Sequence, residues 1–289
     1  MQIAFIGLGI MGSRMAKNLL KNELALTIFN RSPEAISPLV EMGAKRAHSP
    51  QDCVKEAEVV FTMLSTPEVV DQLAFGPEGF VAHMKKNALW VDHSTVNPSF
   101  SLSCHKRTQE QSIRFLDAPV AGTKPQAENG ELVFFVGGRA EDREMAQPYL
   151  NMMGRKIIPV GEAGKGSSLK MLVNALLAES MLVFAETLLL GEKMGLDREF
   201  LLNMLPELPV SPPYTKAKAA MIKADNYEVQ FPLEWMHKDL QLVSQTAYET
   251  NQPLLMANLA KEIYAQARNS EAKRLDFAAI YKFLKEKSE

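Results

Sequence analysis

The chain has 289 residues, a length that accommodates two domains of ordinary size. Its hydrophobic content of 46% and its charged content of 23% are typical of a soluble globular protein. The formal net charge is only -2 and there is no long basic run, so nothing electrostatic favours binding to nucleic acid or to an anionic membrane.

The first half of the chain alternates short apolar runs with amphipathic segments. The predicted strands are continuous β-branched and aromatic runs over 3–8, 25–30, 57–64, 88–94, 113–120, 132–138 and 156–161. A helix is predicted over 11–22, where Met11, Met15, Leu19 and Leu20 recur at helical spacing. Strands that alternate with helices in this way indicate an α/β fold with a mostly parallel sheet.

Only helical patterns follow residue 163. Most of 161–195 is predicted as one long apolar helix, and the proline-rich stretch 205–213 separates two later helices. We therefore predict an α/β domain over 1–163 and an all-helical domain over 164–289 that begins with the long helix.

Residues 172–191 of that helix are apolar enough to suggest a membrane span. They include Glu179 and Glu186, each of which costs about 2.5–3.5 kcal/mol at the centre of a bilayer, so we interpret the segment as a buried helix of a soluble protein. No signal or transit peptide is recognised before the first predicted strand. Cys53 and Cys104 belong to no metal-binding or redox motif. We therefore expect a cytoplasmic protein with two free thiols.

A glycine motif opens the chain. Gly7, Gly9 and Gly12 have GxGxxG spacing, directly after a predicted strand and at the start of a predicted helix. In that context the first glycine permits a tight turn, the second lets the backbone approach a pyrophosphate, and the third allows close packing of helix on strand. The motif predicts a Rossmann dinucleotide-binding domain, although a glycine-rich turn without a ligand is the alternative.

The end of the second predicted strand bears on the choice of cofactor. Sites for NAD usually carry Asp or Glu there, whereas this chain has Asn30, Arg31 and Ser32. A guanidinium group matches the geometry of a 2′-phosphate, and no carboxylate is present to repel it. We predict a preference for NADP(H), and the alternative is that Arg31 is a solvated surface charge.

Two further stretches end predicted strands with small polar residues. In VDHSTVNP (91–98), Thr95 can bond to a cofactor or a substrate. In DAPVAGTKPQAENGEL (117–132), residues 121–123 can present backbone N–H groups and a hydroxyl to an anion. Each stretch taken alone is also compatible with ordinary turn chemistry.

Together, the motifs GLGIMG, DHSTVNP, DAPVAGT, GKGSSLKMLVN and FPLEWMHKDL resemble, in this order, the β-hydroxyacid dehydrogenase family. The resemblance is greatest to its glyoxylate/succinic semialdehyde reductase and γ-hydroxybutyrate dehydrogenase branch. It implies a Rossmann domain, a long interdomain helix, a helical C-terminal domain and reversible hydride transfer between nicotinamide and a short hydroxy acid.

The resemblance also assigns residues. Lys170 falls at the position of the catalytic lysine and Asn174 at that of its supporting asparagine, while Thr95 and Lys238 fall at cofactor contacts. The family commonly has Ser-Gly-Gly at the substrate-anchoring turn, where this chain has Ala-Gly-Thr at 121–123. The predicted cofactor contacts are Gly7, Leu8, Gly9, Ile10, Met11, Gly12, Asn30, Arg31, Ser32, Met63, Leu64, Thr95 and Lys238. The predicted substrate contacts are Ala121, Gly122, Thr123, Lys170, Asn174 and Phe231, and no metal is predicted.

Helix geometry supports a chemical role for Lys170. Asn174 lies about 40° from it around an ideal helix, whereas Glu179 lies about 180° away and cannot be its salt-bridge partner. Burial and the positive end of the helix dipole both lower the pKa of a lysine, which suits it to exchange protons with a substrate oxygen. A lysine whose amine merely reaches solvent at a helix end is the alternative.

Other candidates have weaker signals. Lys238 could neutralise the charge of a ligand or be a surface charge, and Phe231 could wall the pocket or belong to the core. His93 and His237 are interpreted as structural residues.

The sequence thus predicts an NADPH-dependent reductase of small carboxylate-bearing aldehydes such as glyoxylate and succinic semialdehyde. Within the family, 3-hydroxyisobutyrate dehydrogenase and tartronate semialdehyde reductase are alternatives. From other classes we considered a non-catalytic dinucleotide-binding protein and an imine reductase, and Lys170 argues against both. Because the long helix is apolar nearly all round, we also predict a homo-oligomer. The family resemblance implies a dimer or a tetramer.

Overall fold

The computed structural model describes residues 2–288, and the chain divides after Lys170 into two compact units. The predicted boundary lay after residue 163, before the long helix α8 (Lys165–Lys193). The division falls later, inside α8, so the first turns of this helix belong to the N-terminal unit.

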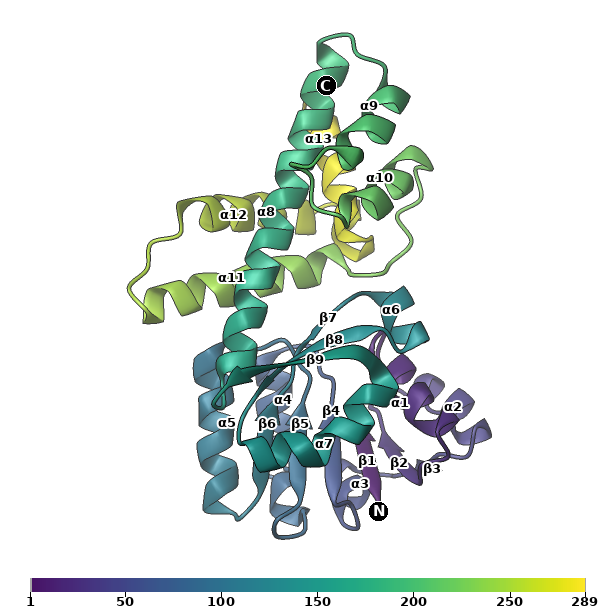
Figure 1. Cartoon of the computed structure of the whole chain (residues 1–289), viewed down its shortest axis with the longest axis vertical. Coiled ribbons are helices and arrows are strands. Elements are labelled where there is room, and N and C mark those ends of the chain that lie inside the picture. The colour runs from purple at the N-terminus through teal and green to yellow at the C-terminus, as the bar shows by residue number, and fades with distance from the viewer. Residues whose placement is uncertain (1, 289) are drawn as a thin grey trace. The chain divides into compact units, whose positions relative to one another are not determined.

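Within residues 2–288 the strands form one nine-stranded sheet (Figure 1), with the order β3-β2-β1-β4-β5-β6-β8-β7 and with β9 paired to β8. The strands are β1 (Ile3–Ile6), β2 (Leu26–Phe29), β3 (Lys45–Arg46), β4 (Val59–Thr62), β5 (Leu89–Asp92), β6 (Arg114–Asp117), β7 (Val120–Ala121), β8 (Leu132–Gly137) and β9 (Gly154–Gly161). Strands β1 to β6 are parallel in the order typical of dinucleotide-binding domains, whereas β8 runs antiparallel to β6 and β7. The mostly parallel sheet expected from the sequence is confirmed.

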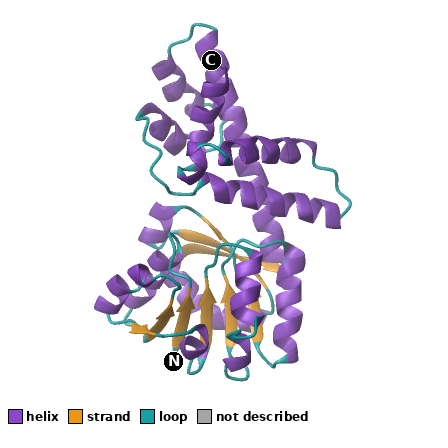
Figure 2. Ribbon diagram, turned by 180° about the vertical axis from the view of Figure 1, so that it is seen from behind, coloured by secondary structure: helices purple, strands orange, loops and turns teal. Residues whose placement is uncertain are grey.

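Burial on both faces explains why the strands read as continuous apolar runs. In β1, Ile3 and Phe5 belong to one hydrophobic cluster, and Ala4 and Ile6 belong to another. Helices flank the sheet (Figure 2). They are α1 (Gly12–Lys21), α2 (Ser37–Glu41), α3 (Pro50–Val54), α4 (Pro67–Phe75), α5 (Pro98–Glu110), α6 (Lys124–Asn129) and α7 (Ala140–Met153), with short 3-10 turns η1 (Pro33–Ala35) and η2 (Val81–His83).

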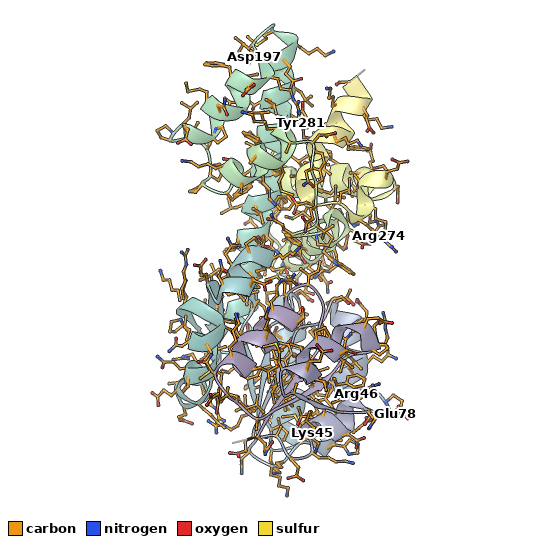
Figure 3. All side chains as sticks on the ribbon, turned by 90° about the vertical axis from the view of Figure 1, so that its right-hand side faces the viewer. Lys45, Arg46, Glu78, Asp197, Arg274 and Tyr281 are labelled. Carbon is orange, nitrogen blue, oxygen red and sulfur yellow. The ribbon has the colours of Figure 1, made fainter. Side chains whose placement is uncertain are left out.

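The structure differs from the predicted strands at two places. The edge strand β3 consists of two exposed charged residues, Lys45 and Arg46 (Figure 3), and has no apolar pattern that could reveal it. The run predicted over 113–120 is interrupted between β6 and β7, where Pro119 has no N–H to donate to a ladder.

Among the described residues of the C-terminal unit the regular elements are all helices, as predicted, with one isolated β-bridge between Pro232 and Asp276. After α8 the unit contains α9 (Arg198–Met204), η3 (Leu205–Glu207), α10 (Thr215–Lys223), α11 (Leu233–Glu249), α12 (Leu255–Arg268), η4 (Glu271–Arg274), η5 (Phe277–Ala279) and α13 (Ile280–Ser288). Two polar side chains labelled in Figure 3 support these helices. Asp197 caps α9 by accepting from the Phe200 N–H at 2.7 Å, and the Tyr281 hydroxyl of α13 donates to Glu192 of α8 at 2.7 Å.

The long helix α8 has two contrasting faces beyond Lys170. Its inner face contributes Ala178, Met181 and Leu188 to the core of the helical unit. In the described part of the chain, α8 is the one helix whose length and composition would let it cross a membrane. Its inner face packs instead against other helices, while several leucines on the outer face are exposed.

Candidate active site

The glycine loop between β1 and α1 has the geometry of a phosphate cradle. Gly7 has a φ of +97°, and a Cβ there would overlap the carbonyl oxygen of Met63. A Cβ on Gly12 would overlap the carbonyl of Gly7, so helix and turn are in close contact. A Cβ on Gly9 would meet nothing within 4 Å, which leaves that backbone open to a ligand.

The start of α1 is also suited to an anion. No side chain caps this end of the helix, and the first turn contains no acidic residue. Its N–H groups and the positive end of its dipole therefore favour a phosphate at the glycine loop. These features fit a dinucleotide.

The residues that follow β2 have different tasks. The side chain of Asn30 accepts from the Leu8 N–H at 2.9 Å and donates to the Ser32 carbonyl at 2.9 Å. Asn30 thus ties the glycine loop to the end of β2, and its amide is already engaged. Arg31 and Ser32 are exposed, and no carboxylate within residues 2–288 pairs with Arg31. Arg31 and Ser32 are therefore the residues of this group that are accessible to a 2′-phosphate, and Arg31 is the one that carries a positive charge.

A buried network that the sequence did not reveal connects the next two loops. The carboxylate of Asp92, at the end of β5, accepts from the hydroxyls of Thr62 at 2.7 Å and Ser94 at 2.6 Å. Ser94 in turn accepts from the Leu64 N–H at 2.9 Å. Burial raises the pKa of Asp92, against the opposing effect of these donors. The network holds the loop after β4, and with it the predicted cofactor contacts Met63 and Leu64, beside the loop that carries Thr95.

The predicted substrate turn contains a helix cap. Gly122 has a φ of +121° and is exposed. Thr123 begins α6 with a capping box, in which its hydroxyl accepts from the backbone N–H of Gln126 and its own backbone N–H donates to the Gln126 side-chain oxygen at 2.9 Å. The hydroxyl also donates to that oxygen at 3.0 Å. The Thr123 hydroxyl is thus committed to α6, so Gly122 is the more accessible part of the turn.

Lys170 lies on the buried face of α8. Only 8% of Lys170 is exposed, and Asn174, one turn further along the helix, is fully buried. Ser167, one turn before Lys170, is also buried on this face, and its hydroxyl bonds to that of Ser101 at 2.8 Å. The face therefore carries three polar side chains in succession and is not purely apolar.

In the C-terminal unit, Asn174 is held by Asp239. The Asn174 amide donates to the Asp239 carboxylate at 2.5 Å, and Lys238 pairs with the same carboxylate at 2.6 Å. The side-chain oxygen of Asn174 is buried and has no hydrogen-bond partner in the described part of the chain. It is consequently free to accept a hydrogen bond from an amine or from a substrate hydroxyl.

Two further candidates, His93 and Phe231, contact aromatic residues of the hydrophobic cores. His93 is fully buried, stacks on Phe61 and bonds through Nδ1 to the Ala118 carbonyl at 2.7 Å. The half-buried ring of Phe231 packs edge-on against Phe277, so it belongs at least in part to the helical core. Among residues 2–288 there is no cluster of three His, Cys, Asp or Glu side chains that could hold a metal.

Comparison with known proteins agrees with this geometry. Residues 2–161 match the family model described as the NAD binding domain of 6-phosphogluconate dehydrogenase. Residues 164–284 match that of NAD-binding of NADP-dependent 3-hydroxyisobutyrate dehydrogenase.

Individual relatives span the chain nearly end to end. Over 98% of its length the chain is 34% identical to glyoxylate/succinic semialdehyde reductase 2, chloroplastic, of Arabidopsis thaliana, and covers 79% of that protein. It is also 34% identical to NAD-dependent L-serine dehydrogenase of Pseudomonas aeruginosa, with 97% of each covered. The structure of Mycobacterium tuberculosis 3-hydroxyisobutyrate dehydrogenase with L-serine superimposes with a TM-score of 0.89 at 30% identity, covering 98% of both chains.

Three observations lead to one conclusion. They are the glycine cradle of the N-terminal unit, the helical C-terminal unit and the two family models, which between them cover nearly the whole chain. The chain belongs to the β-hydroxyacid dehydrogenase family and is an NAD(P)-dependent oxidoreductase that acts on CH–OH groups.

Proposed function

We propose that the protein is an NADPH-dependent reductase of small carboxylate-bearing aldehydes, converting glyoxylate to glycolate and succinic semialdehyde to 4-hydroxybutyrate. The observation that carries the proposal is the buried residue Lys170, one helical turn before the buried Asn174, in a chain that also has a dinucleotide cradle.

In this proposal Lys170 is the general acid and base. Bound NADPH supplies the hydride that reduces the aldehyde carbon. The Lys170 ammonium group donates a hydrogen bond to the carbonyl oxygen and then its proton, so that the oxygen becomes the hydroxyl of the product. In the oxidative direction, neutral Lys170 takes the hydroxyl proton. Asn174, oriented by Asp239, accepts from the amine or from the substrate hydroxyl.

The cofactor preference rests on Arg31. An exposed guanidinium without a carboxylate partner in residues 2–288, at the end of β2, suits a 2′-phosphate. The serine dehydrogenase relative, which is NAD-dependent, makes NAD the alternative. Leu8, Ile10, Ser32, Met63, Leu64, Thr95 and Lys238 stay predicted cofactor contacts.

The substrate class rests on the turn at 121–123 and on the relatives. We propose that the exposed backbone at Gly122 receives the substrate carboxylate, since Thr123 is occupied by its cap and Ala121 lacks a hydroxyl. The similarity to glyoxylate/succinic semialdehyde reductase 2 supports aldehydes such as glyoxylate as substrates. The dehydrogenase structure with L-serine makes oxidation of 3-hydroxyisobutyrate or serine the second candidate.

Replacing Lys170 by Met tests the mechanism, because Met retains an unbranched apolar stem and removes the amine. We expect kcat for glyoxylate to fall by roughly 10²- to 10⁴-fold, the usual contribution of a positioned acid or base, with KM for NADPH unchanged. The rate is read from the absorbance of the reduced nicotinamide.

The matched control is Lys165→Met, which removes an exposed lysine from the first turn of the same helix and should leave kcat unchanged. A Lys170→Met enzyme with wild-type kcat would refute the assignment. The substrate class is tested separately by comparing kcat/KM for glyoxylate, succinic semialdehyde, tartronate semialdehyde, 3-hydroxyisobutyrate, L-serine and a cyclic imine. A preference for either hydroxy acid over both aldehydes would favour the second candidate.

We further propose that the enzyme acts in the cytoplasm as a homo-oligomer. The exposed leucines on the outer face of α8 support self-association, because an apolar stripe of this kind is costly to leave in water.

A further inference from the structure

The long helix α8 lacks a cap of its own. The carbonyl of Gly164 accepts the first intrahelical bond, from the Ser168 N–H at 2.9 Å, so Gly164 occupies the N-cap position. Helices usually have Ser, Thr, Asp or Asn there, whose side chain accepts from an N–H of the first turn. Glycine has no side chain to do this.

A carboxylate from the sheet takes that role. Asp117 is the last residue of β6, and its Oδ1 accepts from the Gly164 N–H at 2.7 Å. Its Oδ2 accepts from the Ser167 N–H, also at 2.7 Å. These are the same two donors that a capping box satisfies, the N–H of the N-cap residue and that of the third helical residue. One buried side chain from a distant strand thus replaces both members of the box.

The contact is close because glycines surround it. A Cβ on Gly137 of β8 would lie 2.5 Å from Asp117 Oδ1. A Cβ on Gly166 would lie 2.9 Å from Asp117 Oδ2 and would overlap the carbonyl of Phe135. The first turn of α8 therefore sits against the end of the sheet with no room for a side chain, and Asp117 is 1% exposed.

This anchor lies just before Lys170. Ser167, which donates to Asp117, precedes Lys170 by three residues, about 4.5 Å along the helix axis and about 60° around it. A rigid helix transmits the placement of its first turn to the next. The glycine loop and Asp117 both lie at the carboxyl ends of strands of the same sheet. Asp117 therefore fixes the start of α8 relative to the sheet that also carries the glycine loop.

We propose that Asp117 is a positioning residue, which fixes the amine of Lys170 by acting as the cap of α8. The inference rests on the proposed acid–base role of Lys170. Asp117 itself touches neither substrate nor cofactor in this scheme, and its effect on the reaction passes entirely through the helix.

The test is a double-mutant cycle on the full-length enzyme. Asp117→Asn loses one of the two acceptors and places an N–H donor against a backbone N–H. We expect kcat to fall about 100-fold, the loss typical of an approximately 1 Å misplacement, with KM for NADPH unchanged. In a Lys170→Met background the same substitution should change kcat by no more than about 2-fold, because the group it positions is already gone.

Two further variants distinguish an effect on the position of α8 from a general loss of protein stability. Gly166→Ala keeps the carboxylate but forces the helix away from Phe135, so it should lower kcat in the wild-type background and not in Lys170→Met. If Asp117→Asn does not fold, Gly166→Ala takes its place in the double-mutant cycle. The control is Asp142→Asn. Asp142 lies on α7, is as buried as Asp117 and pairs with Arg114 and Arg139, so its substitution should lower Tm without changing kcat.

The outcomes are distinct. An equal loss of kcat from Asp117→Asn in both backgrounds would overturn this inference and leave the role of Lys170 standing. Wild-type kcat in both Asp117→Asn and Gly166→Ala would also overturn it. Wild-type kcat in Lys170→Met alone would instead overturn the proposed role of Lys170, and this inference with it.

Discussion

His93 is a fully buried imidazole that the fold keeps neutral. Burial lowers its pKa to about 4, against the opposing hydrogen bond to the Ala118 carbonyl. Because a carbonyl can only accept, Nδ1 carries the proton, and Nε2 is buried without a partner in the described part of the chain. Protonating Nε2 would place a cation between aromatic rings.

His93 should therefore make the protein less stable in mild acid. In the unfolded chain the imidazole titrates near pH 6.5, so below that pH the unfolded state binds a proton that the folded state rejects. The free energy of unfolding should fall as the pH drops from about 6.5 to about 4, by roughly 2 kcal/mol at pH 5. Urea unfolding at about pH 7 and about pH 5, on either side of the pKa of the unfolded imidazole, measures this change.

A His93→Gln variant should lose this part of the pH dependence, while His48→Gln, which removes an exposed histidine, should retain it. The comparison between variants is needed because burial raises the pKa of Asp92 and Asp117. Those carboxyls act in the opposite sense, since their contribution to stability is lost as the pH rises. Equal slopes in His93→Gln and the parent protein would show that His93 is not the responsible group.

Arg31 is the residue on which the cofactor preference should depend. Reversing its charge in Arg31→Asp should raise KM for NADPH by about 10- to 100-fold, as expected for the loss of a charge-assisted hydrogen bond. KM for NADH should change much less, because that cofactor has no 2′-phosphate. Initial rates with each cofactor at saturating glyoxylate give both values.

The same reversal in Arg155→Asp, an exposed arginine on β9, controls for the change in net charge and should leave both KM values unaltered. If Arg31→Asp kept its preference for NADPH, or if Arg155→Asp lost it equally, the 2′-phosphate would have to be recognised elsewhere.

At the scale of elements, the local sequence predicts those strands and helices whose side chains are buried in a regular pattern. The strands β1, β4 and β5 are evident because apolar side chains cover both faces. The edge strand β3 was missed because its two residues are exposed and its pairing uses the backbone alone. The antiparallel direction of β8 was also not predictable, since it depends on the short turn through β7 and α6 and not on side-chain pattern.

The same distinction applies to the residues of the candidate site, where contiguous motifs are visible in the sequence and partners distant along the chain are not. The glycine loop and the lysine of α8 lie in contiguous motifs, so the sequence alone marks them as candidates. The partners that hold them are distant: 47 residues separate Asp117 from Gly164, and 65 separate Asn174 from Asp239. No local pattern marks Asp117 as the cap of α8, although the glycine at its N-cap position was a signal that a cap had to come from elsewhere.

At the scale of the whole molecule, the outer face of α8 bears on oligomeric state. Leu172, Leu176, Val183 and Leu190 are 64%, 68%, 56% and 62% exposed. On an ideal helix they lie within about 40° of one another, so they form a single stripe along the outer face. We propose that a second copy of this chain covers the stripe, because a helix face of this kind is self-complementary across a two-fold axis and the family resemblance implies a homo-oligomer.

A charge in the middle of the stripe should therefore dissociate the oligomer. Leu176→Glu places a carboxylate at a position that is two-thirds exposed in the single chain, so it should leave Tm of a monomer nearly unchanged and disrupt only an interface. Sedimentation velocity should show the parent protein as a dimer or tetramer and Leu176→Glu as a smaller species. Val40→Glu, the same change at an exposed apolar residue of α2, should keep the parental size. If Leu176→Glu sediments with the parent protein, or if the parent is a monomer, the partner of this face is not a second copy of the chain.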